Sequence, residues 1–265
     1  MAGEGVWHAA GKSVAGHTAV YETFLQEPGS SAVAGIAWMD THLLRGQLYS
    51  GSESPGGGPW KFSAPIHSWA AKTLVVAFNG GFKFPDTQGG YYSEGRMQYP
   101  LRAGGAALVI YKNGDVTVGD WGRDFTMSSD ILAVRQDVTL LVDGGKPVPG
   151  LNPNDTSQFG YTLGNIPNVW RAGVGVTADG ALVFVAGPSM EVTQLAELLA
   201  RAGCVRAMTM DINPDWTVLA TYDPAPGGLA SPANGQRLLS GMVQGPYTFF
   251  ESWWPRDFIT MSART

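Results

Sequence analysis

Polar side chains that could carry chemistry follow a predicted buried strand at residues 205–210. Asp211, Asn213 and Asp215 come directly after this strand, and Pro214 ends its hydrogen-bond ladder. A carboxylate in such a position can act as a general base or a nucleophile, and carboxylate and amide oxygens can bind sugar hydroxyls. The sequence therefore places a candidate site at the C-terminal end of this strand.

The same oxygens leave a divalent cation, calcium or magnesium, open as an alternative. Their spacing falls short of an EF-hand loop, which has glycine at its sixth position and glutamate at its twelfth. The four histidines are scattered without metal-ligand spacing, and the single cysteine, Cys204, has no obvious histidine partner. We therefore assign no metal ligand and no certain cofactor.

Two further predicted strand ends carry polar residues beside glycines. Asn79, Gly80 and Gly81 follow one short apolar run, and Arg171 lies just before Ala-Gly. Glycines at strand ends let a ligand approach the backbone closely. An Asn, an Arg and an Asp gathered together would form a polar pocket with one fixed positive charge. Structural roles remain open beside this one: a turn at Asn79-Gly80, an ion pair for Arg171 and turn capping for Asp211.

A tyrosine-rich loop contains another candidate, Glu94, beside Arg96. This glutamate is either a solvated loop carboxylate or a catalytic one that a mobile segment brings to the site. Tyr91, Tyr92 and Trp216 have aromatic faces on which a sugar could stack. Most tryptophans of a β-rich domain nevertheless serve packing, and we expect that of all but one or two here.

The motifs of several other enzyme classes are absent from the sequence. It contains no Gly-x-Ser-x-Gly nucleophile elbow and no Walker phosphate loop. Residues 173–175 read Gly-Val-Gly but lack the third glycine and the following helix of a dinucleotide-binding motif. The net charge of −5, without a basic run, argues against nucleic-acid binding.

The elements that must position these groups are mostly short strands. Hydrophobic residues make up 44% of the chain and charged residues 15%, which favours a folded core, and 36 glycines with 17 prolines predict many tight turns. Hairpins are expected about Asn113-Gly114 and Asp179-Gly180. An amphipathic helix is expected at residues 193–203, with Thr193 as its N-cap. Further strands are expected at residues 17–26, 32–39 and 41–49, the last on a meander.

We predict one α+β domain over residues 1–265, β-rich, with a central mixed sheet and few helices. Residues 1–72 are expected to add N-terminal strands to the same domain. No apolar run reaches membrane-spanning length, and the N-terminus lacks the basic and apolar stretches of a signal peptide. Our hypothesis is an extracellular or cell-envelope protein, the soluble part of an exported chain whose leader was removed.

The order of these motifs resembles the phosphodiester glycosidase (NAGPA-like) family, most strongly over residues 75–222. The matching pieces are Ala-Phe-Asn-Gly-Gly-Phe at 77–82, the strand and Asn-Gly turn at 105–114, Leu-Leu-Val-Asp-Gly-Gly at 140–145, Arg-Ala-Gly-Val-Gly at 171–175 and the helix that leads to Met210-Asp211. In this family a glycine-rich run ending in serine usually follows the aspartate. Here Ile-Asn-Pro-Asp-Trp stands at residues 212–216, which alters the pocket beside Asp211.

The resemblance implies a hydrolase that cleaves the C1–O bond of a sugar-1-phosphodiester. The expected substrate is a bacterial envelope glycan or an exported glycan. The family's aspartate falls on Asp211, its arginine on Arg171 and its asparagine on Asn79. By their chemistry, Asp211 suits a base or nucleophile, Arg171 suits phosphate binding, and Asn79 can hydrogen-bond the sugar or the phosphate. Glu94 is a second-rank catalytic candidate and Arg102 a second-rank binding one. The expected substrate-binding residues are Asn79, Gly80, Gly81, Arg102, Asn213, Asp215 and Trp216.

Three alternatives stay open. The first is a carbohydrate-binding or cell-surface module that keeps this fold without catalysis. The others are an ordinary glycoside hydrolase, which would need a second carboxylate facing Asp211, and a metal-dependent phosphodiesterase. The expected partner is a carbohydrate or a sugar phosphate in each case. The sequence carries no signal for oligomeric state.

Overall fold

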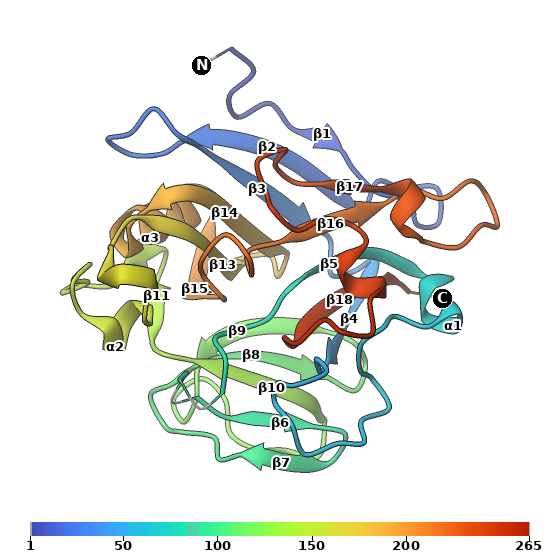
Figure 1. The fold of residues 1–265 in the computed structure, drawn as a ribbon, viewed down its shortest axis with the longest axis horizontal. Helices are drawn as coiled ribbons and strands as arrows, with labels where there is room; N and C mark the ends of the chain where they lie inside the picture. The colour runs from blue at the N-terminus through green and yellow to red at the C-terminus, as the bar shows by residue number, and fades with distance from the viewer. Residues whose placement is uncertain (1, 85, 88, 265) are drawn as a thin grey trace.

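A computed structural model describes residues 2–84, 86–87 and 89–264 of the chain. Within this part of the chain, the strands form three sheets, which Figure 1 shows from one side. The first sheet has, in spatial order, β1 (His8–Ala9), β2 (Val20–Gln26), β3 (Val33–Met39), β14 (Leu182–Met190), β13 (Val169–Thr177), β15 (Cys204–Thr209), β11 (Leu140–Asp143) and β12 (Lys146–Pro147).

The other two sheets are smaller. The second has the order β7 (Arg96–Tyr99), β6 (Tyr91–Ser93), β10 (Ile131–Asp137), β8 (Ala106–Tyr111) and β9 (Val116–Asp120). The third has the order β17 (Gly235–Arg237), β16 (Leu219–Tyr222), β5 (Leu74–Asn79), β18 (Phe258–Ala263) and β4 (Leu44–Tyr49).

Helices are few and short. The α-helices are α1 (Ser68–Ala71), α2 (Thr156–Phe159) and α3 (Val192–Arg201), and the 3-10 turns are η1 (Leu163–Asn165), η2 (Pro232–Asn234) and η3 (Thr248–Phe250). No helix in the described part of the chain is long and apolar enough to cross a membrane.

The main core lies where the three sheets meet. Val20 and Ala37 of the first sheet, Leu108 and Ile110 of the second and Val76 of the third are all buried in one hydrophobic cluster. The strand β5 lies at the centre of the third sheet and all six of its residues are buried. This explains its continuous apolar sequence, because both faces of the strand are covered.

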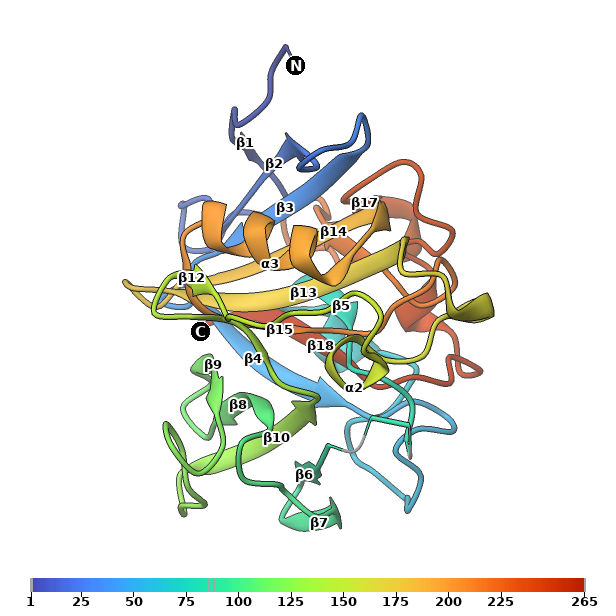
Figure 2. The ribbon, with the colours of Figure 1, turned by 90° about the vertical axis from the view of Figure 1, so that its left-hand side faces the viewer.

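The helix α3 covers the other face of the first sheet, across β13 and β14 (Figure 2). Leu195, Leu198 and Leu199 are its buried face, as the sequence pattern indicates. The N-cap is Glu191 rather than the expected Thr193, because the Glu191 and Gln194 side chains form a reciprocal capping box. The N-cap therefore lies two residues earlier than predicted.

The β-rich architecture with few helices, and the two predicted hairpins, are confirmed. The sheet type is a correction, since every ladder between the described strands is antiparallel and the central sheet is not mixed. The expected meander is also wrong at its third strand. β4 leaves β3 and pairs with β18, so the N-terminal strands contribute to two different sheets.

Candidate active site

Asp211 lies directly after β15, between the first and third sheets. The backbone N–H of Met210 donates to the carbonyl of Ala172 in β13, and that of Asp211 donates to the carbonyl of Gly80, which follows β5, at 2.8 Å. The structure thus brings together two of the strand ends singled out in the sequence. The carboxylate is 4% exposed, and its Oδ1 accepts the N–H of Ile212 at 2.9 Å.

The cation beside Asp211 is Arg256. Its Nε lies 3.2 Å from Oδ2 of Asp211, and its guanidinium covers the ring of Trp216 at 4.3 Å from the centroid. Trp216 in turn packs against Trp254, with centroids 5.7 Å apart. Sequence reasoning missed Arg256 as a site residue. Its signal was weak, an Arg-Asp pair just before the last strand.

Burial controls the protonation of Asp211. Loss of water raises the pKa of Asp211 to about 7, and Arg256 opposes this shift, as does the N–H of Ile212. The carboxylates of Asp137 and Asp257 raise the same pKa further. Asp211 therefore changes its charge near neutral pH, where an ordinary aspartate is fully ionised.

Several buried polar atoms around this ion pair lack a hydrogen-bond partner among the described residues. They are Asp211 Oδ2, Asn213 Oδ1, Thr217 Oγ1, Trp254 Nε1 and Arg256 Nε. The geometry between Asp211 and Arg256 is that of an ion pair without a hydrogen bond. Buried polar groups in native proteins are satisfied with few exceptions. Five of the eleven such atoms among the described residues lie in residues 211–217 and 254–256, which makes this region a candidate for binding a polar ligand.

Asn79 is fully buried and its amide contacts only backbone. It accepts the N–H of Val218 at 3.0 Å and donates to the carbonyl of Gly80 at 3.0 Å. Gly80 and Gly81 allow protein groups to approach rather than a ligand. A Cβ on Gly80 would lie 2.1 Å from an oxygen of Asp257. Asn79, Gly80 and Gly81 therefore support the backbone around the site through contacts with other protein groups.

A buried charge cluster explains why those glycines are required. Arg135 of β10 donates from Nε to Asp257 at 2.8 Å, and both side chains are fully buried. Asp137 accepts the N–H of Phe82 at 2.9 Å and the hydroxyl of Thr87 at 2.6 Å. Burial raises the pKa of Asp137 to about 6. This cluster was not predicted from the sequence, because residues 131–137 have an ambiguous pattern.

Arg171 is fully buried on the α3 side of the first sheet. Its guanidinium donates to the carbonyls of Met190 at 2.7 Å, Pro167 at 2.8 Å and Phe159 at 3.3 Å. Desolvation lowers the pKa of Arg171 to about 10, and the charge that opposes this is Glu191. The structure thus engages Arg171 with backbone carbonyls and not with Asp211.

Glu94 and Arg102 lie on the second sheet and hold loops. Glu94 occupies the β6–β7 turn with φ of 52°, and its carboxylate accepts the N–H groups of Lys61 and Phe62. Arg102 exchanges hydrogen bonds between its backbone and the side chain of Gln136, and its guanidinium donates to the carbonyl of Val138 at 3.4 Å. These hydrogen bonds join both residues to the loops around the second sheet.

The residues after Asp211 divide into inward and outward positions. Asn213 adopts φ of 74° and its side-chain oxygen is buried, while Asp215 is exposed. The described residues contain no group of three or more His, Cys, Asp or Glu side chains placed to hold a metal ion. With Asp211 buried and Asp215 exposed, these donors do not converge as a divalent-cation site requires.

Comparison with known proteins agrees with the architecture. A phosphodiester glycosidase family model matches residues 72–219, which is more than half of the chain. This chain belongs to the phosphodiester glycosidase family. No curated protein matched it.

Two solved structures are similar in fold. One is the zebrafish N-acetylglucosamine-1-phosphodiester alpha-N-acetylglucosaminidase catalytic domain, auto-inhibited by its pro-peptide, with a TM-score of 0.53 and 16% identity over 98% of this chain and 88% of that one. The other is a hypothetical protein from Synechocystis, with a TM-score of 0.51 and 13% identity over 94% of this chain and 63% of that one. At these identities the likeness concerns the fold alone.

Removing one partner of the buried pair should unfold the site. We expect Arg135→Met to lower the free energy of unfolding by about 3–5 kcal/mol, because Asp257 would be left buried without its cation. Equilibrium denaturation in urea measures this change. The matched control is Arg123→Met, which breaks half-exposed pairs with Asp124 and Asp143 and should cost about 0–1 kcal/mol. Equal losses in the two variants would contradict the assigned role.

Proposed function

We propose that this protein hydrolyses a sugar-1-phosphodiester on an envelope or exported glycan, with Asp211 as base or nucleophile. Membership of the phosphodiester glycosidase family supports the reaction class. The observation that carries the proposal is the nearly buried Asp211–Arg256 pair, surrounded by polar atoms without partners. On this proposal the protein works outside the cytoplasm or within the cell envelope, where such glycans are found.

The chemistry suits one working carboxylate and one cation. In the reaction the C1–O bond of the sugar breaks, the oxygen of water becomes attached to C1, and a phosphate monoester departs with the bonding electrons. Because a phosphate monoester has a second pKa near ~6, it leaves with little help from a general acid. The enzyme must instead stabilise the oxocarbenium-like sugar and the charge on the leaving phosphate.

Asp211 fits the first requirement and Arg256 fits the second. A carboxylate with a pKa of about 7 is a stronger base than an ordinary aspartate and is still ionised in about half of the molecules at neutral pH. The side chain of Arg256 is 11% exposed, and its Nε has no hydrogen-bond partner among the described residues. It can therefore meet phosphate oxygens, for which its planar fork is suited.

Arg171 supports the site indirectly on this proposal. Its donors are used by the carbonyls of Phe159, Pro167 and Met190, which fixes the segment that follows α2 against β14. We infer that it positions this wall, and that Arg256 takes the phosphate contact that the family resemblance placed on Arg171. On this proposal, Asn213 and Trp216 are the residues that contact the sugar.

The ordinary glycosidase alternative has weaker support. Such an enzyme needs a second carboxyl that reaches the leaving oxygen. The two carboxylates that act on Asp211 are those of Asp137 and Asp257, and both are fully buried with partners of their own. The other alternative is a binding module without catalysis. The reason to consider it is the changed sequence at residues 212–216, directly after Asp211.

Asp211→Asn should remove most of the hydrolytic activity. The amide keeps the size of the side chain but cannot act as a base or nucleophile, so kcat on a chromogenic sugar-1-phosphodiester should fall by about 100- to 10,000-fold. Thermal melting should show an intact fold. Turnover close to that of the wild type would refute the role of Asp211. Binding of substrate without turnover in the wild type would favour the non-catalytic module.

The activity should rise with pH through about 7. Asp211 must be ionised to work, so kcat/KM should fall about tenfold per pH unit below that value and level off above it. Since Arg256 lowers the pKa of Asp211, Arg256→Ala should move the midpoint upward. A rate that declines as pH rises from 5 to 8 would show that Asp211 acts as an acid instead.

Replacing Arg256 should chiefly affect activity, whereas replacing Arg171 should chiefly affect stability. Arg256→Ala should keep the fold and lower kcat/KM by about 100- to 1,000-fold, because the leaving phosphate loses its cation. Arg171→Ala should chiefly lower the melting temperature, because three buried carbonyls lose their donors. Kinetics and melting curves of both variants separate these roles. A stable Arg171→Ala protein that has lost its activity would return the phosphate contact to Arg171.

A further inference from the structure

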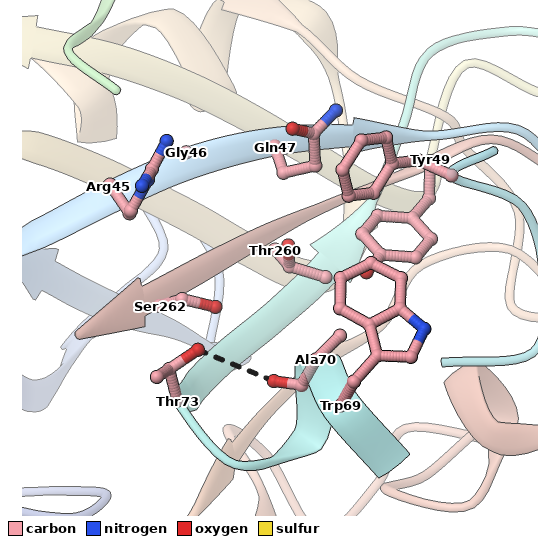
Figure 3. Close-up of a pocket in the computed structure, with 10 residues that line it drawn as sticks. Arg45, Gly46, Gln47, Tyr49, Trp69, Ala70, Thr73, Thr260 and Ser262 are labelled. Atoms are coloured by element: carbon pink, nitrogen blue, oxygen red, sulfur yellow. Dashed lines mark hydrogen bonds between the residues drawn. The ribbon is translucent and has the colours of Figure 1, made fainter. Parts of the chain in front are cut away.

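A hollow on the third sheet has a lining that does not include Asp211. The cavity, about 200 Å³ in volume, lies on the outer face of β4 and β18 and beside α1 (Figure 3). It is smaller than the roughly 300–1,000 Å³ typical of sites that enclose a drug-sized ligand. A site of this size suits one ring of a longer chain.

Its floor is a row of polar side chains on two paired strands. Gln47 is opposite Thr260, and Arg45 is opposite Ser262, so all four residues share one face of the sheet. The hydroxyls of Thr260 and Ser262 have no hydrogen-bond partner among the described residues. The guanidinium of Arg45 likewise has none there. Gln47 donates from Nε2 to the carbonyl of Leu48 at 3.1 Å. Within the described part of the chain, the unused groups of this strip are therefore the two hydroxyls, the Arg45 guanidinium and the side-chain oxygen of Gln47.

One end of the cavity is aromatic. Tyr49 meets Phe62 edge to face, with centroids 5.5 Å apart, and Phe62 meets Trp69 in the same manner at 5.6 Å. Trp69 is 53% exposed at the outer end of this column, although the ring of His67 stacks against it with centroids 6.4 Å apart. Figure 3 shows Trp69 and Tyr49 at one end of the hollow and Arg45 at the other.

The cavity is also positively charged in an acidic protein. Arg45 is the only ionisable group among the lining residues that the structure describes, apart from the phenol of Tyr49, whereas the whole chain carries a net charge of −5. Arg45 and Tyr49 are four residues apart, which is about 13 Å along an antiparallel strand. The cation and the aromatic end are therefore spaced for neighbouring units of one extended ligand.

We propose that this groove binds an acidic oligosaccharide. One sugar ring stacks on the exposed face of Trp69, its hydroxyls bond to Gln47, Thr260 and Ser262, and an acid group of the next unit pairs with Arg45. An exposed aromatic face beside polar groups is what a sugar needs, since its rings have apolar C–H faces and polar edges. The proposal does not rest on the hydrolytic function of Asp211.

Calorimetric titration with three hexasaccharides tests the groove: hexagalacturonate, a mannohexaose with a terminal phosphate, and neutral maltohexaose. We expect at least one of the two acidic chains to bind, and the pair distinguishes a carboxylate from a phosphate as the acid group. Neutral maltohexaose should bind at least about tenfold more weakly, and salt should weaken the acidic complex. If neither acidic chain binds, or the neutral one binds equally well, the proposal fails.

Variants assign the binding to this groove. Trp69→Ala and Arg45→Ala should each weaken binding about tenfold or more, which corresponds to the loss of one stacking or ionic contact. The matched controls are Trp7→Ala, an exposed tryptophan just before β1, and Arg201→Ala, an exposed arginine on α3. Both controls should bind as the wild type does. Melting temperatures should stay unchanged in all four.

Asp211→Asn separates this inference from the proposed function. The variant should bind the acidic hexasaccharide with unchanged affinity, because the groove does not include Asp211. Loss of binding in Asp211→Asn, with full binding in Trp69→Ala, would place the ligand at the candidate active site. That result would contradict the proposal that the groove binds the oligosaccharide. Conversely, Trp69→Ala should hydrolyse a small sugar-1-phosphodiester at the wild-type rate.

Discussion

The buried pair of Arg135 and Asp257 is the constraint on which the site depends. Arg135 comes from β10 of the second sheet, and Asp257 lies just before β18 of the third. Arg135 also donates to the carbonyl of Phe82, after β5. A buried pair repays its desolvation only when its geometry and additional hydrogen bonds are good. The pair therefore locks two sheets and the Asn79–Phe82 turn together, and Arg256, next to Asp257 in sequence, is held in place as a result.

This arrangement determines the electrostatics of Asp211. The aspartate is placed where water is excluded, one cation lies at 3.2 Å and two further carboxylates act on it through the protein. Burial outweighs the cation, so the carboxyl titrates near neutral pH. A group poised in this way is frequent at functional sites. Here it coincides with a cluster of unsatisfied polar atoms, which an isolated structural ion pair would not require.

The family motifs serve two different purposes in this fold. Asn79, Gly80 and Arg171 belong to matched motifs, yet their side chains or Cα atoms contact backbone and buried charges. They build the frame of the site. Five buried polar atoms without a hydrogen-bond partner among the described residues are in the segments 211–217 and 254–256. The three motif residues and these unpartnered groups thus lie in different parts of the chain.

The sequence by itself determined the β-rich class, the hairpins, the amphipathic face of α3 and the position of Asp211 at a strand end, because each depends on local pattern. Only the tertiary structure decided which cation meets Asp211. Arg135 and Asp257 are 122 residues apart. Between Asp211 and Arg256 the chain forms β16, β17 and the loops around them. Partners at such separations depend on which strands pair and which face each side chain takes. For the same reason Arg171, a plausible ligand for phosphate in the sequence, lies on the face of β13 that α3 covers.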